Sequence, residues 1–200
     1  PMPDEPYLRA LLDDLCVSGR VLTPDQASAA RAAGHSDVWL QGLASSGILL
    51  VEKSRQVLAT WLCCAYLLWR AKYRPHQLIL VQSKREDDAA NLVFNKESFV
   101  ARISFLETHL PAYLRTADLP RAGSFGQLYF PTGSRIWGIP EGGEIIRSNT
   151  PSVVFSDEAG FQPEFGKAFT AALPCIKGGG QFVAISTAEP GEFARLVEAA

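Results

Sequence analysis

Four short runs of mostly apolar residues constrain the fold of this 200-residue chain more than any other feature. They occupy positions 48–51, 77–83, 152–156 and 181–186. Each has the length of a buried strand, and segments with the apolar spacing of helices lie between them, at 59–69, 84–110 and 164–175. Strands that alternate with helices predict an α/β fold with a mainly parallel sheet and helices on both faces.

The rest of the chain adds smaller pieces to this framework. Residues 7–17 and 23–34 have helical spacing and precede the first strand, so we expect a helical N-terminal subdomain at 1–46 and a core domain at 47–200. Two short strands at 127–130 and 134–138 predict a hairpin, and a glycine-rich connection at 140–149 follows it.

Composition narrows the possible functions. The net charge of −2 gives no general basic field, so any contact with nucleic acid must use a local patch or an assembly. The four cysteines fit no zinc spacing, and Cys63 and Cys64 lie in an apolar helical segment, which predicts buried free thiols. No segment is long and apolar enough for us to expect a membrane span.

The turn after the first strand has the composition of an anion site. Lys53 and Arg55 supply positive charge, and Thr60 lies at the start of the next helix, where free backbone N–H groups and the helix dipole favour an anion. The stretch does not match the usual phosphate-loop pattern G-x-x-x-x-G-K-[ST]. Taken alone, the stretch also fits an ordinary strand, turn and helix that carry solvated cations, and the rest of the chain must decide between the two interpretations.

Polar pairs end two later strands. Asp157-Glu158 follows the apolar run at 152–156, and Ser186-Thr187 ends the last strand. In a parallel sheet the carboxyl ends of the strands lie at one edge, where ligands bind. An aspartate there can orient Mg²⁺, and the adjacent glutamate can polarise an attacking water. Each pair alone could be a plain strand end. Together with the cationic turn, the two pairs predict a site for a nucleoside triphosphate.

In this order, the motifs resemble those of the large terminase subunits of tailed bacteriophages, the motors that package DNA into capsids. That family often has a deviant phosphate loop, K-S-R-Q-x-G-x-[ST]. Here the loop consists of Lys53, Ser54, Arg55, Gln56, Val57, Leu58, Ala59 and Thr60. The later matches are a glycine-rich loop with an arginine, Arg147, then Asp157-Glu158-Ala-Gly-Phe161, and then Ser186-Thr187-Ala188.

The resemblance implies a RecA-like (ASCE) P-loop ATPase core that uses ATP and Mg²⁺. It implies that Lys53 and Arg55 contact the β- and γ-phosphates and that Thr60 and Asp157 hold Mg²⁺. Glu158 would be the catalytic carboxylate. The pair Ser186-Thr187 would couple the γ-phosphate to motion. Arg147 would act as an arginine finger inserted into the site of a neighbouring subunit, although an ordinary surface arginine is an equal alternative.

One residue departs from the family pattern, because Leu58 occupies the position of the usual glycine. Glycine there allows a positive φ and close approach of the backbone to phosphate. A leucine in the left-handed region costs on the order of 1–2 kcal/mol. Either the loop keeps ordinary backbone angles, or nucleotide binding is weakened.

The resemblance therefore implies a motor ATPase that translocates double-stranded DNA into a procapsid in the host cytoplasm. Expected partners are DNA, further copies of the chain in a ring, the portal and the small terminase subunit, with no membrane. No segment after Ala188 is long enough for the family's nuclease domain, so we expect no nuclease activity in this chain. The alternatives are a helicase-like DNA-dependent ATPase and a degenerate ATPase fold that serves as an assembly module.

Overall fold

The computed structural model describes residues 47–53, 59–93, 101–116, 121–122 and 126–199. These residues belong to one compact unit, Gly47–Ala200. The predicted helical subdomain at 1–46 and the loop residues 54–58 lie outside the described residues. The fold below is therefore that of the predicted core domain.

A seven-stranded sheet runs through the described residues in the order β1-β7-β6-β2-β5-β4-β3. Its strands are β1 Gly47–Glu52, β2 Leu78–Gln82, β3 Arg121–Ala122, β4 Gln127–Tyr129, β5 Arg135–Ile139, β6 Val153–Asp157 and β7 Gln181–Ser186. The strands from β1 to β5 in this order pair in parallel, and β3 and β4 pair antiparallel at the edge. The predictions of a mainly parallel sheet and of the hairpin are confirmed.

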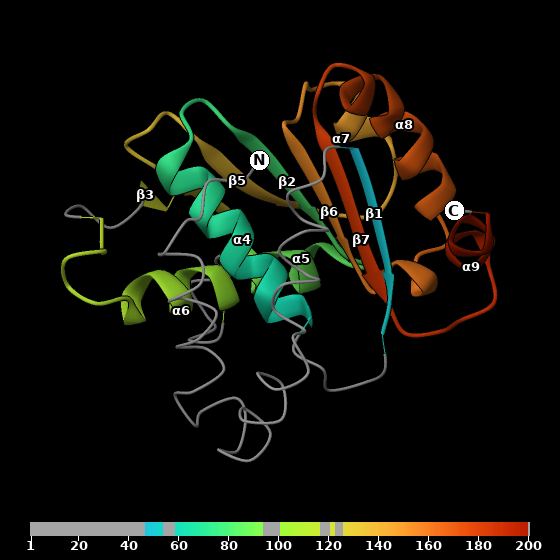
Figure 1. Ribbon diagram of the computed structural model, residues 1–200, viewed down its shortest axis with the longest axis horizontal. Helices are drawn as coiled ribbons and strands as arrows, with labels where there is room; N and C mark the ends of the chain where they lie inside the picture. The colour runs from blue at the N-terminus through green and yellow to red at the C-terminus, as the bar shows by residue number, and fades with distance from the viewer. Residues whose placement is uncertain (1–46, 54–58, 94–100, 117–120, 123–125, 200) are drawn as a thin grey trace, which may run out of the picture. The chain divides into compact units, whose positions relative to one another are not determined.

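Helices cover both faces of the sheet (Figure 1). The helices are α4 Ala59–Tyr73, α5 Glu86–Val93, α6 Arg102–His109, α7 Glu144–Arg147, α8 Phe165–Lys177 and α9 Glu192–Glu198, together with the 3-10 turn η1 Ala159–Phe161. Helices α4 and α6 pack together on one side, whereas α8 and α9 pack against each other and against β1 on the other. None of the described helices is both long and apolar enough to cross a membrane.

The strands supply buried side chains to the core on both faces of the sheet. Successive side chains of a strand point to opposite faces, so an apolar strand supplies both sides at once. Leu80, Val154 and Phe182 belong to the apolar cluster that contains Phe165 of α8 and Phe193 of α9. Their neighbours along the strands are equally buried, which explains why these runs carry no polar alternation.

The prediction of one continuous helix at 84–110 is wrong. The structure has two helices there, α5 and α6, and Ala101 before α6 has extended backbone angles (φ −63°, ψ 113°). The apolar positions of both helices nevertheless face the core, since Val93, Ile103 and Leu106 are buried. The sequence did not predict β3, α7 or α9.

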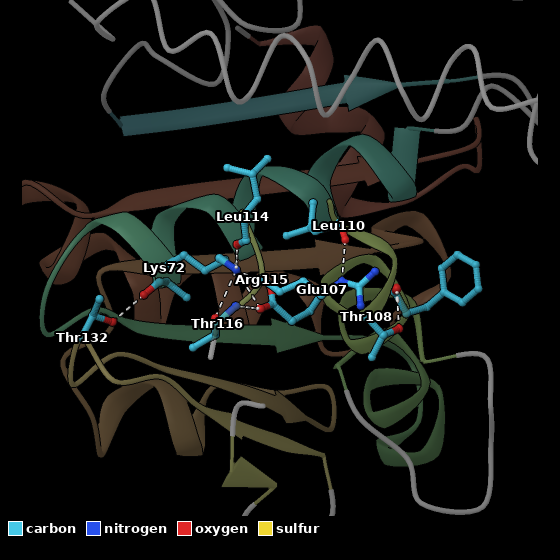
Figure 2. Close-up of polar contacts among 10 residues, drawn as sticks. Lys72, Glu107, Thr108, Leu110, Leu114, Arg115, Thr116 and Thr132 are labelled. Atoms are coloured by element: carbon cyan, nitrogen blue, oxygen red, sulfur yellow. Dashed lines mark hydrogen bonds and ion pairs between the residues drawn. The ribbon is translucent and has the colours of Figure 1, made fainter. Parts of the chain in front are cut away.

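A buried ion pair joins α4 to the end of α6 (Figure 2). Lys72 Nζ lies 2.7 Å from both carboxylate oxygens of Glu107, and it also donates to Leu114 O and to Thr116 Oγ1. The backbone N–H of Thr116 donates to Glu107 Oε1 over 2.9 Å. The pair therefore fixes the segment after α6 against α4.

Candidate nucleotide site

Strand order brings the predicted polar residues to one edge of the sheet. Strand β7 lies between β1 and β6, with Ser186 opposite Glu52 and Ile185 opposite Asp157. The backbone N–H of Lys53 donates to Ser186 O over 2.8 Å. Three segments more than 25 residues apart along the chain therefore end side by side, as the sequence predicted.

Two direct contacts connect the first segment to the acidic pair. Lys53 Nζ lies 2.7 Å from Glu158 Oε1. The hydroxyl of Thr60, in the first turn of α4, donates to Asp157 Oδ1 over 2.9 Å. Lysine, hydroxyl and both carboxylates thus meet in one place, while Ser54, Arg55, Gln56, Val57 and Leu58 lie outside the described residues.

Asp157 is the most electrostatically perturbed carboxyl of the site. Burial raises its pKa, and the neighbouring negative charge of Glu158 raises it further. The hydrogen bond from Thr60 and the charges of Arg102 and Lys53 oppose this rise. A buried carboxylate with a raised pKa lacks compensating positive charge, which a bound cation would supply.

The residues at Asp157 fit a magnesium ion by donor type. Hydroxyl and carboxylate oxygens are hard ligands, and Mg²⁺ sites at phosphates use one or two protein groups, the remaining ligands being phosphate oxygens and water. The 2.9 Å between Thr60 Oγ1 and Asp157 Oδ1 matches the spacing of about 3 Å between adjacent ligands of an octahedral Mg²⁺. Within the described residues no cluster of three or more His, Cys, Asp or Glu could hold a metal alone.

Glu158 has an unusual backbone. Its angles of φ 51° and ψ 46° lie in the left-handed region, directly after β6. Such a conformation is rare for a residue with a long side chain and is a local strain of the kind found at functional sites. These backbone angles turn the chain from β6 into η1, and the Glu158 side chain forms its ion pair with Lys53.

Ser186 and Thr187, at the end of β7, have different surroundings. The Oγ of Ser186 is buried and accepts a hydrogen bond of 2.9 Å from the backbone N–H of Gly160, in η1. A Cβ on Gly160 would lie 2.9 Å from that same Oγ, so the close approach requires glycine. Thr187 instead lines the cavity with Glu158.

A cavity of about 650 Å³ opens at this edge, a volume within the range of small-molecule sites. Its described lining is Lys53, Ser83, Lys84, Asp88, Asn91, Leu92, Arg102, Asp157, Glu158, Phe161 and Thr187. Ser83, Lys84 and Arg102 were not predicted from the sequence. Ser83 and Lys84 directly follow β2, so the strand-end argument could have found them, whereas Arg102 comes from a helix with no motif around it.

Arg102 adds a cation without a carboxylate partner among the described residues. Its guanidinium lies over the ring of Trp61, 5.7 Å from the centroid, next to Thr60 in α4. The charge of Arg102 lowers the pKa of Asp157 and so partly offsets the buried carboxylate. The described lining as a whole is balanced, with three basic side chains (Lys53, Lys84 and Arg102) and three acidic ones (Asp88, Asp157 and Glu158).

Arg147 does not join this group. It is the last residue of α7, half exposed, and pairs with Glu144 over 2.6 Å. It lines a different cavity, together with Ser152 and Gly180, which precede strands β6 and β7. Arg147 therefore lies at the amino ends of the strands, whereas Glu158 lies at their carboxyl ends.

Behind the site, the predicted buried thiols are confirmed. Cys63 and Cys64 of α4 are free and buried. Burial raises the pKa of both thiols. They remain neutral at physiological pH and do not compete for a cation at Asp157.

The sheet order and the edge at which these groups meet define the class of protein, a RecA-like α/β domain. No family model and no curated protein matches the sequence. Among solved structures, the chain is similar to the HK97 bacteriophage large terminase, with a TM-score of 0.59 and 15% identity, over 100% of this chain and 38% of that one.

Two further structures agree. The Thermus phage P74-26 large terminase ATPase domain matches with a TM-score of 0.53 and 15% identity, over 79% of this chain and 67% of that one. A large terminase from a thermophilic bacteriophage, in complex with ADP, matches with a TM-score of 0.50 and 13% identity, over 88% and 38%. The chain has the fold of phage large terminase ATPase domains, and it spans 38% of the HK97 chain.

Proposed function

We propose that this chain is the ATPase motor domain of a large terminase subunit, hydrolysing ATP to move double-stranded DNA into a procapsid. The observation that carries the proposal is the meeting of the Lys53–Glu158 and Thr60–Asp157 pairs at one cavity. The fold of terminase ATPase domains supports it, and so does the bound ADP in one of the similar structures.

In this proposal Lys53 and the loop from Ser54 to Ala59 bind the phosphates, with Arg55 at the γ-phosphate. Thr60 and Asp157 hold Mg²⁺, which supplies charge neutralisation at the phosphates. Arg102 adds a further cation to the lining of the same cavity. Positively charged groups that converge on a triphosphate act mainly by stabilising developing negative charge.

Glu158 accepts the proton of the attacking water. Lys53 Nζ lies 2.7 Å from this carboxylate, so the two groups form an ion pair. A triphosphate competes for Lys53 and frees Glu158 for the water. Ser186 then transmits the change, because its hydroxyl holds the turn that follows Glu158.

Assembly completes the site in this proposal. Arg147 lies at the opposite edge of the sheet from its own Glu158, so it reaches a triphosphate only on a neighbouring subunit. A ring of such subunits around DNA, docked on the portal and assisted by the small terminase subunit in the host cytoplasm, brings these edges together.

Nucleotide binding and turnover of three variants test the proposal. Glu158→Gln is expected to bind MgATP like the parent but to hydrolyse it about 10²–10⁴-fold more slowly, because the proton acceptor is lost. Lys53→Ala is expected to weaken binding itself. Glu86→Gln, an exposed glutamate outside the cavity, is the matched control.

Two outcomes would overturn parts of the proposal. Turnover of Glu158→Gln at the parent rate would remove Glu158 from the chemistry. If the parent fails to bind ATP at millimolar concentration with Mg²⁺, the degenerate assembly module is favoured. Translocation is tested separately, by measuring whether double-stranded DNA accelerates ATP hydrolysis.

A further inference from the structure

A second cavity, of about 550 Å³, lies at the other edge of the sheet. Gln77, Ser152 and Gly180 line it, and each of these residues directly precedes a strand. Since β2, β6 and β7 are parallel, this cavity is separated from Lys53 and Glu158 by the length of the strands, about 17 Å for five residues.

The lining of this cavity carries positive charge only. It contains two arginines, Arg70 and Arg147, and no Asp or Glu. Polar groups surround them: Gln77, Asn149, Thr150 and Ser152. Glu144, which pairs with Arg147, is 89% exposed at its side chain, and an exposed pair of this kind is weak.

Arg70 is held entirely by neutral acceptors among the described residues. One terminal nitrogen donates to the Tyr66 hydroxyl (3.0 Å) and to Gln181 Oε1 (3.3 Å), and the other donates to Gln77 Oε1 (2.9 Å). Its Nε is buried and has no hydrogen-bond partner. A guanidinium positioned by a rigid neutral network keeps its full charge available to a ligand.

We propose that this cavity is an anion site that binds a phosphoryl group through Arg70 and Arg147. The half-exposed guanidinium of Arg147 can bind phosphate oxygens by paired, charge-assisted hydrogen bonds, and Arg70 adds positive charge beside it. The cavity offers no carboxylate that would repel the ligand. The phosphoryl group can come from a free nucleotide that enters this cavity or from the DNA backbone. The inference does not depend on the function of the Lys53–Glu158 cavity.

Cys175 provides a local readout, because it lines the cavity and is only half-buried. The rate at which iodoacetamide alkylates Cys175, followed by mass spectrometry of its peptide, is measured against inorganic pyrophosphate at constant ionic strength. Saturable protection is expected. Arg147→Gln should raise the pyrophosphate concentration for half-protection about tenfold, the loss of one charged hydrogen bond.

Arg195→Gln is the matched control, since Arg195 is also exposed and paired with a glutamate three residues before it, but lies outside the cavity. It should leave protection unchanged. Arg70→Lys, which keeps the positive charge but loses the planar guanidinium group, should also weaken protection. Circular dichroism checks that this variant folds. If Arg147→Gln and Arg195→Gln behave alike, the proposal is overturned.

Two further measurements identify the source of the phosphoryl group and distinguish this cavity from the Lys53–Glu158 cavity. A short DNA duplex that protects Cys175 in an Arg147-dependent manner identifies the DNA backbone as a ligand, whereas protection by pyrophosphate alone points to a nucleotide. Lys53→Ala must keep the pyrophosphate protection. Loss of protection in Lys53→Ala, or no protection by either probe, would overturn the second site and leave the proposed ATPase function untouched.

Discussion

At the residue scale, Glu158 combines an unusual backbone conformation with a side chain that pairs with Lys53. The left-handed conformation costs a non-glycine residue roughly 1–2 kcal/mol. We predict that Glu158→Gly is more stable than Glu158→Ala by about 1 kcal/mol, the reverse of the usual order, because glycine adopts these angles without strain. Both variants lose the carboxylate, so its ion pair with Lys53 cancels from the comparison.

Urea denaturation of the two variants measures this difference. The same glycine and alanine substitutions at Lys167, an exposed residue inside α8, form the control, and there alanine should be more stable than glycine. Equal stability of the two Glu158 variants would show that the turn relaxes and that no strain is stored in it.

The raised pKa of Asp157 predicts a pH-dependent stability. Burial favours the protonated form in the folded state, so folding takes up a proton. Stability contributed by this group is therefore lost as pH rises from its unfolded pKa, about 3.9, through the raised folded value. Asp157→Asn removes the charge and should be more stable than the parent at neutral pH, with a gap that closes toward pH about 4.

This gap is measured by urea denaturation at a series of pH values in the presence of EDTA. The same comparison of Asp157 with Asp157→Asn is made in a Thr60→Val background. Thr60→Val removes the hydrogen bond that lowers the pKa of Asp157, so the stability difference should be larger there. A stability difference that does not vary with pH would show that Asp157 does not titrate in this range.

Side-chain chemistry was readable from the sequence, whereas backbone conformation was not. The predicted meeting of Lys53, Asp157 and Ser186 rested on a general rule, that parallel strands end at one edge. The left-handed Glu158 had no sequence signal, because glutamate is not a residue that this conformation prefers. Arg102 was missed for a related reason, since only the packing of α6 brings it to the cavity.

At the scale of elements, the error at 84–110 shows the limit of periodicity. Apolar spacing identified the buried positions on both sides of Ala101 correctly. It did not detect the extended backbone at Ala101, because two helices with the same buried face continue one another's pattern. Spacing predicts which side chains are buried better than it predicts where a helix begins.

The Lys72–Glu107 pair gives a prediction at this scale. Both side chains are buried, at 7% and 2% exposure, and they tie α4 to α6 and to the segment at 114–116 (Figure 2). Glu107→Leu alone should destabilise the fold by about 3–5 kcal/mol, because it leaves a buried charge unpaired. The double variant Lys72→Met, Glu107→Leu should recover much of that loss.

A double-mutant cycle measured by urea denaturation tests this coupling. The exposed pair Lys167–Glu164, three residues apart in sequence, provides the control, with an expected coupling of less than about 1 kcal/mol. If the double Lys72, Glu107 variant is as unstable as the sum of the single variants, the pair acts through packing and not through charge.

At the scale of the whole domain, the sheet separates two sets of charged groups. The Lys53–Glu158 cavity lies at the carboxyl ends of the strands, and the Arg70–Arg147 cavity lies at their amino ends. The site at the carboxyl ends could be predicted from the sequence, because its residues follow strands in recognisable pairs. The sequence did not predict the second cavity, whose residues share no motif and are brought together only by the starts of three strands.

This separation makes the proposed role of Arg147 testable by subunit mixing. If Arg147 acts on a neighbour, Arg147→Ala and Glu158→Gln are each inactive alone but complement each other when mixed. An Arg147→Ala subunit keeps its Glu158, and an adjacent Glu158→Gln subunit supplies the arginine. In a randomly mixed 1:1 assembly about a quarter of the interfaces are complete, so about a quarter of the parent rate is expected.

The ATPase rate of the mixture is measured at concentrations where the parent rate per chain rises with protein concentration, which signals assembly. Mixing Glu158→Gln with Lys53→Ala is the control, because both changes damage the same cavity and every Lys53→Ala subunit that keeps Glu158 lacks its phosphate contact. Only the Arg147 mixture should recover activity. An Arg147→Ala variant with the parent rate, or a mixture without recovery, would mean that α7 does not complete the site of a neighbouring subunit.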